Sequence, residues 1–234
     1  MSRRYLIVNA DDFGQCAEVN RGIMEAHEHG IVTSASLMVR WPAAVEAALY
    51  ARTSISFSVG LHVDLGEWVY KEQGWTAVYE VVPTRDRSAV AREVRRQLKT
   101  FRDLVGSDPT HLDSHQHVHR EEPVRSILVE VGQQLGIPLR HYHPQIRYCG
   151  DFYGQTAKGL PRLEDISIEA LLRIFANVPV GLSELACHPS RGGHPSSMYA
   201  QERDEELKVL CHPRARAALL SEQIQLCSFR SAGL

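Results

Sequence analysis

The chain has 234 residues, 44% of them hydrophobic, which is enough for one large domain or two small ones with a buried core. The net charge of -2 gives no chain-wide basic surface for nucleic acid or an anionic membrane. Five cysteines, scattered singly, favour a reducing cytoplasmic setting. The first residues lack the apolar core of a signal peptide, and no apolar run reaches the length of a membrane span.

Short apolar runs alternate with helical patterns along the chain. Strand patterns occur at residues 5–10, 33–39, 54–63, 109–115, 137–143, 182–188 and 224–229. Helical patterns occur at 17–29, after Pro42, and at 88–105, 122–135, 168–177 and 201–220. This alternation predicts a mainly parallel sheet in one α/β domain, either open or closed as a barrel. In both forms the catalytic and ligand-binding residues lie at the carboxyl ends of the strands.

Polar side chains follow four of these apolar runs. They are Asn9, Asp11 and Asp12 after the first run, His62 and Asp64 after the third, the stretch THLDSHQHVH at 110–119, and Glu184 and His188 around the sixth. The groups are far apart in the chain, so they meet only if the strands are neighbours. A parallel barrel meets that condition.

The stretch at 110–119 holds four of the chain's twelve histidines. If residues 111–117 are extended, alternation places His111, Asp113, His115 and His117 on one face. Same-face residues of a strand are roughly 6–7 Å apart, which is too far for all four to bind one ion. We therefore expect one or two metal ligands here, with the others as supports. Polar loop residues bonded to the backbone are the alternative.

The adjacent carboxylates of Asp11 and Asp12 need a separate explanation. At the end of a buried strand they would repel each other and raise each other's pKa unless a cation binds one of them. The second would then be free to accept a proton. The alternative is a solvated helix N-terminus, where aspartates interact favourably with the dipole. Histidines with carboxylates suit Zn²⁺ or a similar ion, which makes metal-assisted hydrolysis the leading reaction class.

Five segments together resemble the YdjC-like carbohydrate deacetylase family, which includes chitooligosaccharide deacetylases and hopanoid-associated HpnK-type proteins. The segments are NADDFG at 9–14, NRGIMEAHEHGIVTSASLMV at 20–39, VGLHVDL at 59–65, PTHLDSHQHVH at 109–119 and ELACHP at 184–189. They occur in the family's order and cover nearly the whole chain. The resemblance implies a distorted (β/α) TIM-like barrel formed by residues 1–234 as a single domain.

The resemblance also implies metal-dependent removal of an acetyl group from an N-acetylated sugar or oligosaccharide. By motif, the metal ligands would be Asp12, His62 and His115. Asp11 would be the general base that takes a proton from the metal-bound water. His188 would stabilise the tetrahedral intermediate or protonate the leaving amine.

One divalent ion is expected, Mg²⁺ by family usage and Zn²⁺ or a similar ion by ligand type. Residues predicted to orient the ligands or contact substrate are His111, Asp113, His117 and Glu184. Candidate aromatic platforms for sugar rings are Trp68, Trp75, Tyr79 and Tyr153. The segment between His62 and His111 is shorter than in many family members, and a homodimer is common in the family.

Two other functions use the same residues. A metal-dependent phosphoesterase would favour clustered cations, and only Arg120, Arg140 and Arg147 lie close in sequence. A catalytically inactive sugar- or metal-binding protein would keep the ligands but lack the base or the acid. Asp11 and His188 are both present, which favours the deacetylase.

Overall fold

The computed structural model describes residues 3–72, 74–192 and 199–232. The strands are β1 (Arg4–Phe13), β2 (Ser34–Leu37), β3 (Ser58–Val63), β4 (Gly66–Lys71), β5 (Gly74–Glu80), β6 (Leu112–Ser114), β7 (Ile146–Cys149), β8 (Gly181–Cys187) and β9 (Ile224–Cys227). The α-helices are α1 (Ala17–Glu28), α2 (Ala44–Thr53), α3 (Arg87–Val105), α4 (Val124–Leu135), α5 (Ile168–Asn177), α6 (Ala200–Leu210) and α7 (Pro213–Ser221). Two 3₁₀ helices cover His115–Arg120 and Leu163–Ile166.

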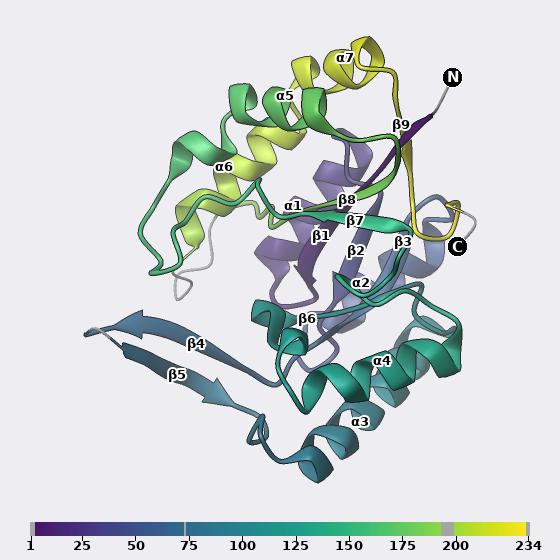
Figure 1. The fold of residues 1–234 in the computed structure, drawn as a ribbon, viewed down its shortest axis with the longest axis vertical. Helices are drawn as coiled ribbons and strands as arrows, with labels where there is room; N and C mark the ends of the chain where they lie inside the picture. Colours follow the sequence, from purple (N-terminus) through teal and green to yellow (C-terminus); the bar gives the residue numbers. More distant parts are fainter. Residues whose placement is uncertain (1–2, 73, 193–198, 233–234) are drawn as a thin grey trace.

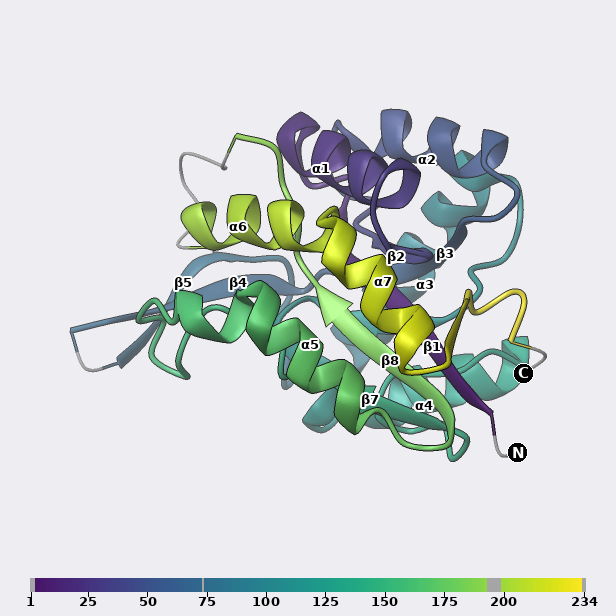
Figure 2. The same cartoon turned by 90° about the horizontal axis from the view of Figure 1, so that it is seen from above.

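Seven of the described strands form one parallel sheet in the order β6-β3-β2-β1-β8-β7, with β9 also paired to β1. The sheet is strongly curled, and helices cover its outer side (Figures 1 and 2). Between β6 and β7 the described chain contributes one parallel bridge, Leu112 to Leu139. The fold is therefore a distorted (β/α) barrel, as the resemblance implied.

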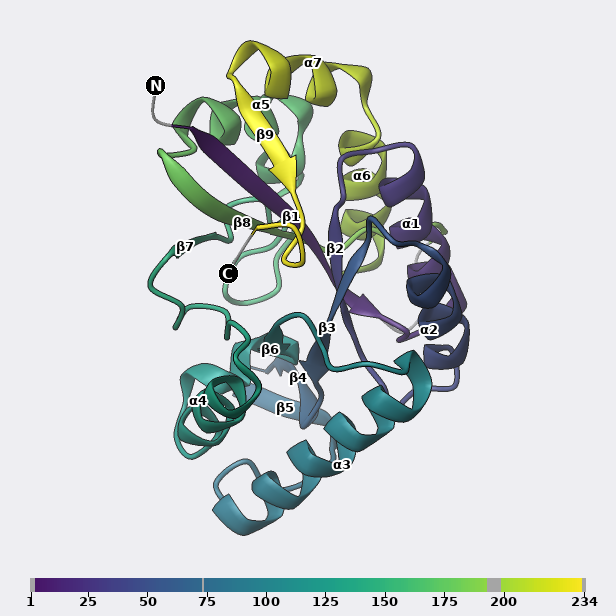
Figure 3. The same cartoon turned by 90° about the vertical axis from the view of Figure 1, so that its right-hand side faces the viewer.

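Strand β1 is the centre of this sheet. Its residues from Arg4 to Ala10 pair with β8, those from Arg4 to Ile7 also pair with β9, and its last residues pair with β2 (Figure 3). Its residues from Leu6 to Phe13 are all buried, which explains the continuous apolar run at its start. The two carboxylates at its end are therefore presented from the middle of the molecule.

Helix α3 agrees with the periodicity of residues 88–105. Val90, Val94 and Phe101 lie on its buried face. The helix begins at a side-chain cap, where Asp86 accepts a hydrogen bond from the Ala89 backbone nitrogen at 3.0 Å. It ends at Gly106, whose φ of 81° gives the left-handed cap that glycine adopts readily. The amphipathic prediction is confirmed here.

Two of the expected elements differ in the structure, and one further element was not expected. The helix expected at 201–220 is two helices, because Pro213 lacks the amide hydrogen that a continuous helix needs and starts α7 instead. The strand expected at 137–143 is reduced to the bridge at Leu139, and β7 lies further along the chain. The antiparallel hairpin β4–β5 was not expected, and it projects from the body of the molecule (Figure 1).

None of the described helices combines the length and apolar character needed to cross a membrane.

Candidate metal centre and catalytic pocket

Five residues predicted from sequence meet in one cavity. Asp11 and Asp12 end β1, His62 lies in β3, His115 follows β6, and His188 follows β8. All five line a cavity of about 590 Å³ at the carboxyl edge of the sheet. Parallel strands bring these distant segments together because their carboxyl ends share one edge.

A backbone irregularity explains why both aspartates reach the cavity. In a regular strand, adjacent side chains point to opposite faces. Asp12 has a φ of 67°, in the left-handed region, and the pairing of β1 with β2 shifts register between Ala10 and Phe13. Aspartate tolerates this conformation better than most residues. The break in alternation lets both carboxylates line the same cavity.

A second irregularity positions His115. Strand β6 ends at Ser114, and the 3₁₀ segment that follows contains Gln116 at φ 50° and His117 at φ 54°. The strand expected at 109–115 is therefore reduced to Leu112–Ser114, and the alternation considered for residues 111–117 does not extend to His115 or His117. The turn lets the His115 Nδ1–H donate to Asp12 Oδ1 at 2.9 Å.

Asp12, His62 and His115 form a candidate metal centre. All three are buried, and one ligand atom from each lies within 4.8 Å of the others. His62 Nε2 is 3.3 Å from Asp12 Oδ1 without hydrogen-bond geometry. Within the described ranges, the Nε2 atoms of His62 and His115 have no hydrogen-bond partner although they are buried. Buried unpartnered imidazole nitrogens beside a carboxylate are a donor set that fits a divalent cation.

Asp113 lies behind His62 and fixes its orientation. The His62 Nδ1–H donates to Asp113 Oδ1 at 2.7 Å, which leaves Nε2 directed to the candidate centre. Burial opposes a charge on His62, but Asp113 outweighs it and raises the His62 pKa to about 10. The pocket thus favours positive charge at this point, as a proton or as a metal ion.

His111 supports this arrangement indirectly. Its Nε2 is 3.0 Å from Ser36 Oγ, and that hydroxyl donates to Asp113 Oδ2 at 2.6 Å. The His111 ring stacks on Phe229 with centroids 3.8 Å apart. A Cβ on Gly60 would lie 2.5 Å from this ring, so glycine is required there by close packing. Among the described residues, hydrogen bonds connect His111 to the ligand His62 through Ser36 and Asp113.

Arg140 is a buried cation that the sequence reasoning did not assign to the site. It donates to both Asp11 oxygens, at 2.6 and 2.7 Å, and to Glu184 at 2.8 Å, and its Nη2 lies 2.8 Å from Asp113. Burial alone would raise the Asp11 pKa, but Arg140 holds it below its usual value. Burial prevails at Glu184 despite Arg140, and its pKa rises to about 7.

Arg203 is a second buried arginine at the centre. Its Nη2 donates to Asp12 Oδ2 at 2.5 Å, while Asp12 Oδ1 faces the two histidines. Burial would raise the Asp12 pKa, but Arg203 and His115 keep it well below the usual range. No local motif pairs Arg140 with Asp11 or Arg203 with Asp12, since the partners lie far apart in the sequence.

His188 lies between two carboxylates. Its Nε2 is 3.8 Å from Asp11 Oδ2, and its Nδ1 is 3.7 Å from Glu206 Oε1. The His188 backbone N–H donates to Glu206, which also accepts from the Tyr199 hydroxyl at 2.6 Å. Burial lowers the pKa of His188, but Glu206 and Asp11 outweigh it and raise that pKa above its ordinary value.

Three of the four predicted aromatic platforms line the cavity, namely Trp68, Trp75 and Tyr153. Tyr79 instead donates to Asp64 Oδ1 at 3.0 Å and packs edge-on against Trp41. Trp68 and Trp75 come from the projecting hairpin β4–β5. The hairpin therefore forms part of the cavity wall.

His117 also lines the cavity but contacts a different group from His115. Its ring lies 5.7 Å from His119 and 5.3 Å from His141, measured between centroids, and its Nε2 lies 3.3 Å from the Tyr148 hydroxyl. Burial lowers the pKa of His119 to about 3 and that of His141 to about 4. The rings of His119 and His141 are therefore neutral at pH 7.

Comparison with known proteins supports the resemblance. The model of the YdjC-like protein family matches residues 5–221. A carbohydrate deacetylase of Geobacillus stearothermophilus is 32% identical, with 97% of each chain covered. A chitooligosaccharide deacetylase of Klebsiella pneumoniae is 30% identical over 97% of this chain and 98% of its own.

A solved structure of a putative cellobiose-phosphate cleavage protein from Enterococcus faecalis has the same fold, with a TM-score of 0.77 at 23% identity over 98% of both chains. The family match extends over the motifs that carry Asp11, Asp12, His62, His115 and His188. The chain belongs to the YdjC-like protein family.

Proposed function

We propose that this protein is a metal-dependent hydrolase that removes the acetyl group from an N-acetylated sugar or oligosaccharide, and that residues 1–234 form one such domain. The observation that carries the proposal is the buried Asp12, His62 and His115 cluster, which opens into the same cavity as Asp11 and His188. The names of the relatives, carbohydrate and chitooligosaccharide deacetylases, support the reaction and the substrate class.

Asp12, His62 and His115 would hold a single divalent cation, Mg²⁺ or Zn²⁺. When bound, such a cation supplies Lewis acidity to the attacking water and to the acetamide carbonyl. The chain's part is to fix the ligands: the His62 Nδ1–H is anchored on Asp113, and Arg203 holds the second oxygen of Asp12.

Asp11 accepts the proton of the attacking water in this proposal. Arg140 holds its carboxylate through two parallel hydrogen bonds, which fixes its direction toward the cavity. Because Arg140 lowers its pKa, Asp11 stays ionised at neutral pH and is available as a base.

His188 donates a proton to the leaving amine, which is a poor leaving group unless it is protonated. Glu206 and Asp11 raise the pKa of this imidazole and thereby favour its protonated form. Their surroundings lower the pKa of the base, Asp11, and raise the pKa of the acid, His188, as a site that contains both groups requires. His188 Nε2 and Asp11 Oδ2 are 3.8 Å apart, which supports a role for both at one substrate group.

The cations of the site favour this reaction over phosphoester cleavage. A phosphate group is bound by arginines that are free to donate to it. Arg140 is surrounded by Asp11, Asp113 and Glu184, and Arg203 is paired with Asp12. Both guanidinium groups are thus already neutralised by carboxylates.

Acetate release from a panel of N-acetylated mono- and oligosaccharides tests the reaction. We expect release that chelator treatment abolishes and that added Mg²⁺ or Zn²⁺ restores. A p-nitrophenyl phosphoester serves as the alternative substrate. Turnover of the phosphoester with no acetate from any sugar would overturn the proposal.

Asp11→Asn separates the deacetylase from an inactive binding protein. The variant should keep its metal but lose at least about 100-fold in kcat, because a general base contributes that much or more. Metal analysis and acetate release on the same sample check this. Asp103→Asn, on the exposed face of α3, is the matched control and should behave as wild type. An unchanged rate in Asp11→Asn would remove Asp11 as the base.

A further inference from the structure

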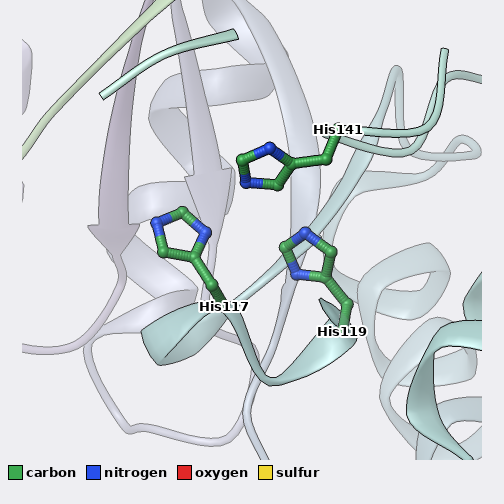
Figure 4. Close-up of side chains that lie close together, drawn as sticks. All are labelled: His117, His119 and His141. Atoms are coloured by element: carbon green, nitrogen blue, oxygen red, sulfur yellow. The ribbon is translucent and has the colours of Figure 1, made fainter. Parts of the chain in front are cut away.

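A second cluster of imidazoles lies in the wall of the cavity, apart from the ligands described above. His117 and His119 come from the 3₁₀ segment after β6, and His141 comes from the segment after the Leu139 bridge. One nitrogen from each ring lies within 4.8 Å of the others. The three rings turn toward a shared space (Figure 4).

The nitrogens of this cluster include buried atoms with no protein partner. Considering only the residues that the structure describes, His119 Nε2 and His117 Nδ1 are buried and lack a hydrogen bond. His119 is fully buried, so its unpartnered nitrogen has no solvent to bond to. Such an atom costs free energy unless a ligand is present.

The opposite nitrogens are anchored in a way that suits metal binding. His119 Nδ1 lies 2.7 Å from Ser114 Oγ, and His117 Nε2 lies 3.3 Å from the Tyr148 hydroxyl. When the anchored nitrogen carries the hydrogen, the other has its lone pair free for an ion. His141 is oriented by Tyr148, since the two rings are 4.2 Å apart.

Backbone strain accompanies this arrangement. His117 has a φ of 54° and His141 a φ of 70°, so two of the three histidines are in the left-handed region that non-glycine residues rarely adopt. Residues in such conformations persist where the surrounding structure holds them, and they gather at binding sites.

We propose that His117, His119 and His141 bind a second metal ion of the Zn²⁺ class. Three imidazoles without a carboxylate select Zn²⁺, Cu²⁺ or Ni²⁺ over Mg²⁺ or Ca²⁺. Three protein ligands leave a tetrahedral ion one open position. Because His117 lines the cavity, the ion would lie in the cavity wall. The proposal does not depend on the deacetylase reaction.

Zinc stoichiometry tests the proposal without an activity measurement. The full chain is stripped with chelator, loaded with Zn²⁺, dialysed, and analysed for bound metal by mass spectrometry. We expect two ions per chain in the wild type and one in His141→Ala. His62→Ala should also keep one, and the double variant should keep none. His141 is exposed, so its removal leaves the core intact.

Two further variants keep the test decisive. His117→Ala should lose the same ion as His141→Ala, while His29→Ala, on an exposed histidine outside the cluster, should retain two. Excess Mg²⁺ should leave the ion of the histidine cluster in place. A single wild-type ion that both His141→Ala and His117→Ala retain, or two ions in both variants, would show that the cluster binds no metal.

Discussion

At the residue scale, one guanidinium holds three carboxylates that would otherwise repel one another. Arg140 contacts Asp11, Asp113 and Glu184, and its side chain is 1% exposed. Asp11 is the proposed base, and Asp113 orients His62. The position of Arg140 therefore affects both the candidate base and a candidate metal ligand.

Removing this cation should strongly destabilise the protein. Arg140→Met is expected to lower the free energy of unfolding by about 3–5 kcal/mol, because it leaves buried carboxylates without a partner. Urea unfolding at pH 7 measures the change. The matched control is Arg147→Met, on an exposed arginine, which should change stability by less than about 0.5 kcal/mol. Equal stabilities for the two variants would contradict this account of Arg140.

Glu184 should make stability fall as pH rises. Its folded pKa, about 7, lies above its ordinary value of 4.5 because it is buried. Between these values the folded state retains a proton that the unfolded state has lost, so raising the pH favours unfolding. The slope is at most about 1.4 kcal/mol per pH unit, and it vanishes above pH 7.

Glu184→Gln isolates this effect because it keeps an oxygen for Arg140 but cannot titrate. The stability of wild type minus that of the variant should decrease between pH 5 and pH 7 and then level off. Chemical denaturation at several pH values supplies the comparison. A difference that stays constant, or rises with pH, would mean that Glu184 is not protonated in the fold.

At the element scale, the hairpin β4–β5 adds a wall to a cavity whose chemistry comes from the parallel sheet. Trp68 and Trp75 lie in this hairpin and line the cavity. Trp75 is 61% exposed, which is unusual for so large an apolar side chain and suits contact with a sugar ring.

Trp75→Ala should weaken binding of an oligosaccharide without changing the chemical step. We expect KM to rise about tenfold, equivalent to ~1.4 kcal/mol, with kcat nearly unchanged. Val78→Ala removes another exposed apolar side chain of the same hairpin and is the matched control. Steady-state kinetics on the best substrate of the panel measures both constants. A fall in kcat at constant KM would assign Trp75 a role in the chemical step instead.

At the scale of the whole molecule, a bound cation would join segments that are distant in sequence. Its proposed ligands come from the end of β1, from β3 and from the turn after β6. An ion that binds only the folded chain stabilises it by mass action, about 2.7 kcal/mol at 100 times its dissociation constant. For a chain of this size that corresponds to an increase in Tm of roughly 5–10 °C.

Thermal unfolding with and without the ion measures this effect, in the His141→Ala background so that the second proposed ion is absent. Adding His62→Ala to that background should remove most of the increase. If saturating metal leaves the Tm unchanged while His62 is intact, the three residues do not form a folded-state site.

The sequence by itself determined the fold class and the motifs of the cavity. Apolar runs and amphipathic periods depend on neighbours a few residues away, so β1 and α3 could be recognised from their own residues. The resemblance placed Asp11, Asp12, His62, His115 and His188 in one site because they occur in family motifs. The structure brings these five residues to one cavity, and their roles remain proposals.

Only the tertiary structure decided how these residues are held. The left-handed backbone at Asp12 and the turn after Ser114 are set by packing, and strand alternation gives no sign of them. No sequence motif pairs Arg140 with Asp11 or Arg203 with Asp12, because the partners are 129 and 191 residues apart. His141 likewise comes next to His117 and His119 where the Leu112–Leu139 bridge brings its segment beside β6. Periodicity reports local geometry, whereas buried charge pairs and ligand clusters depend on which distant segments become neighbours.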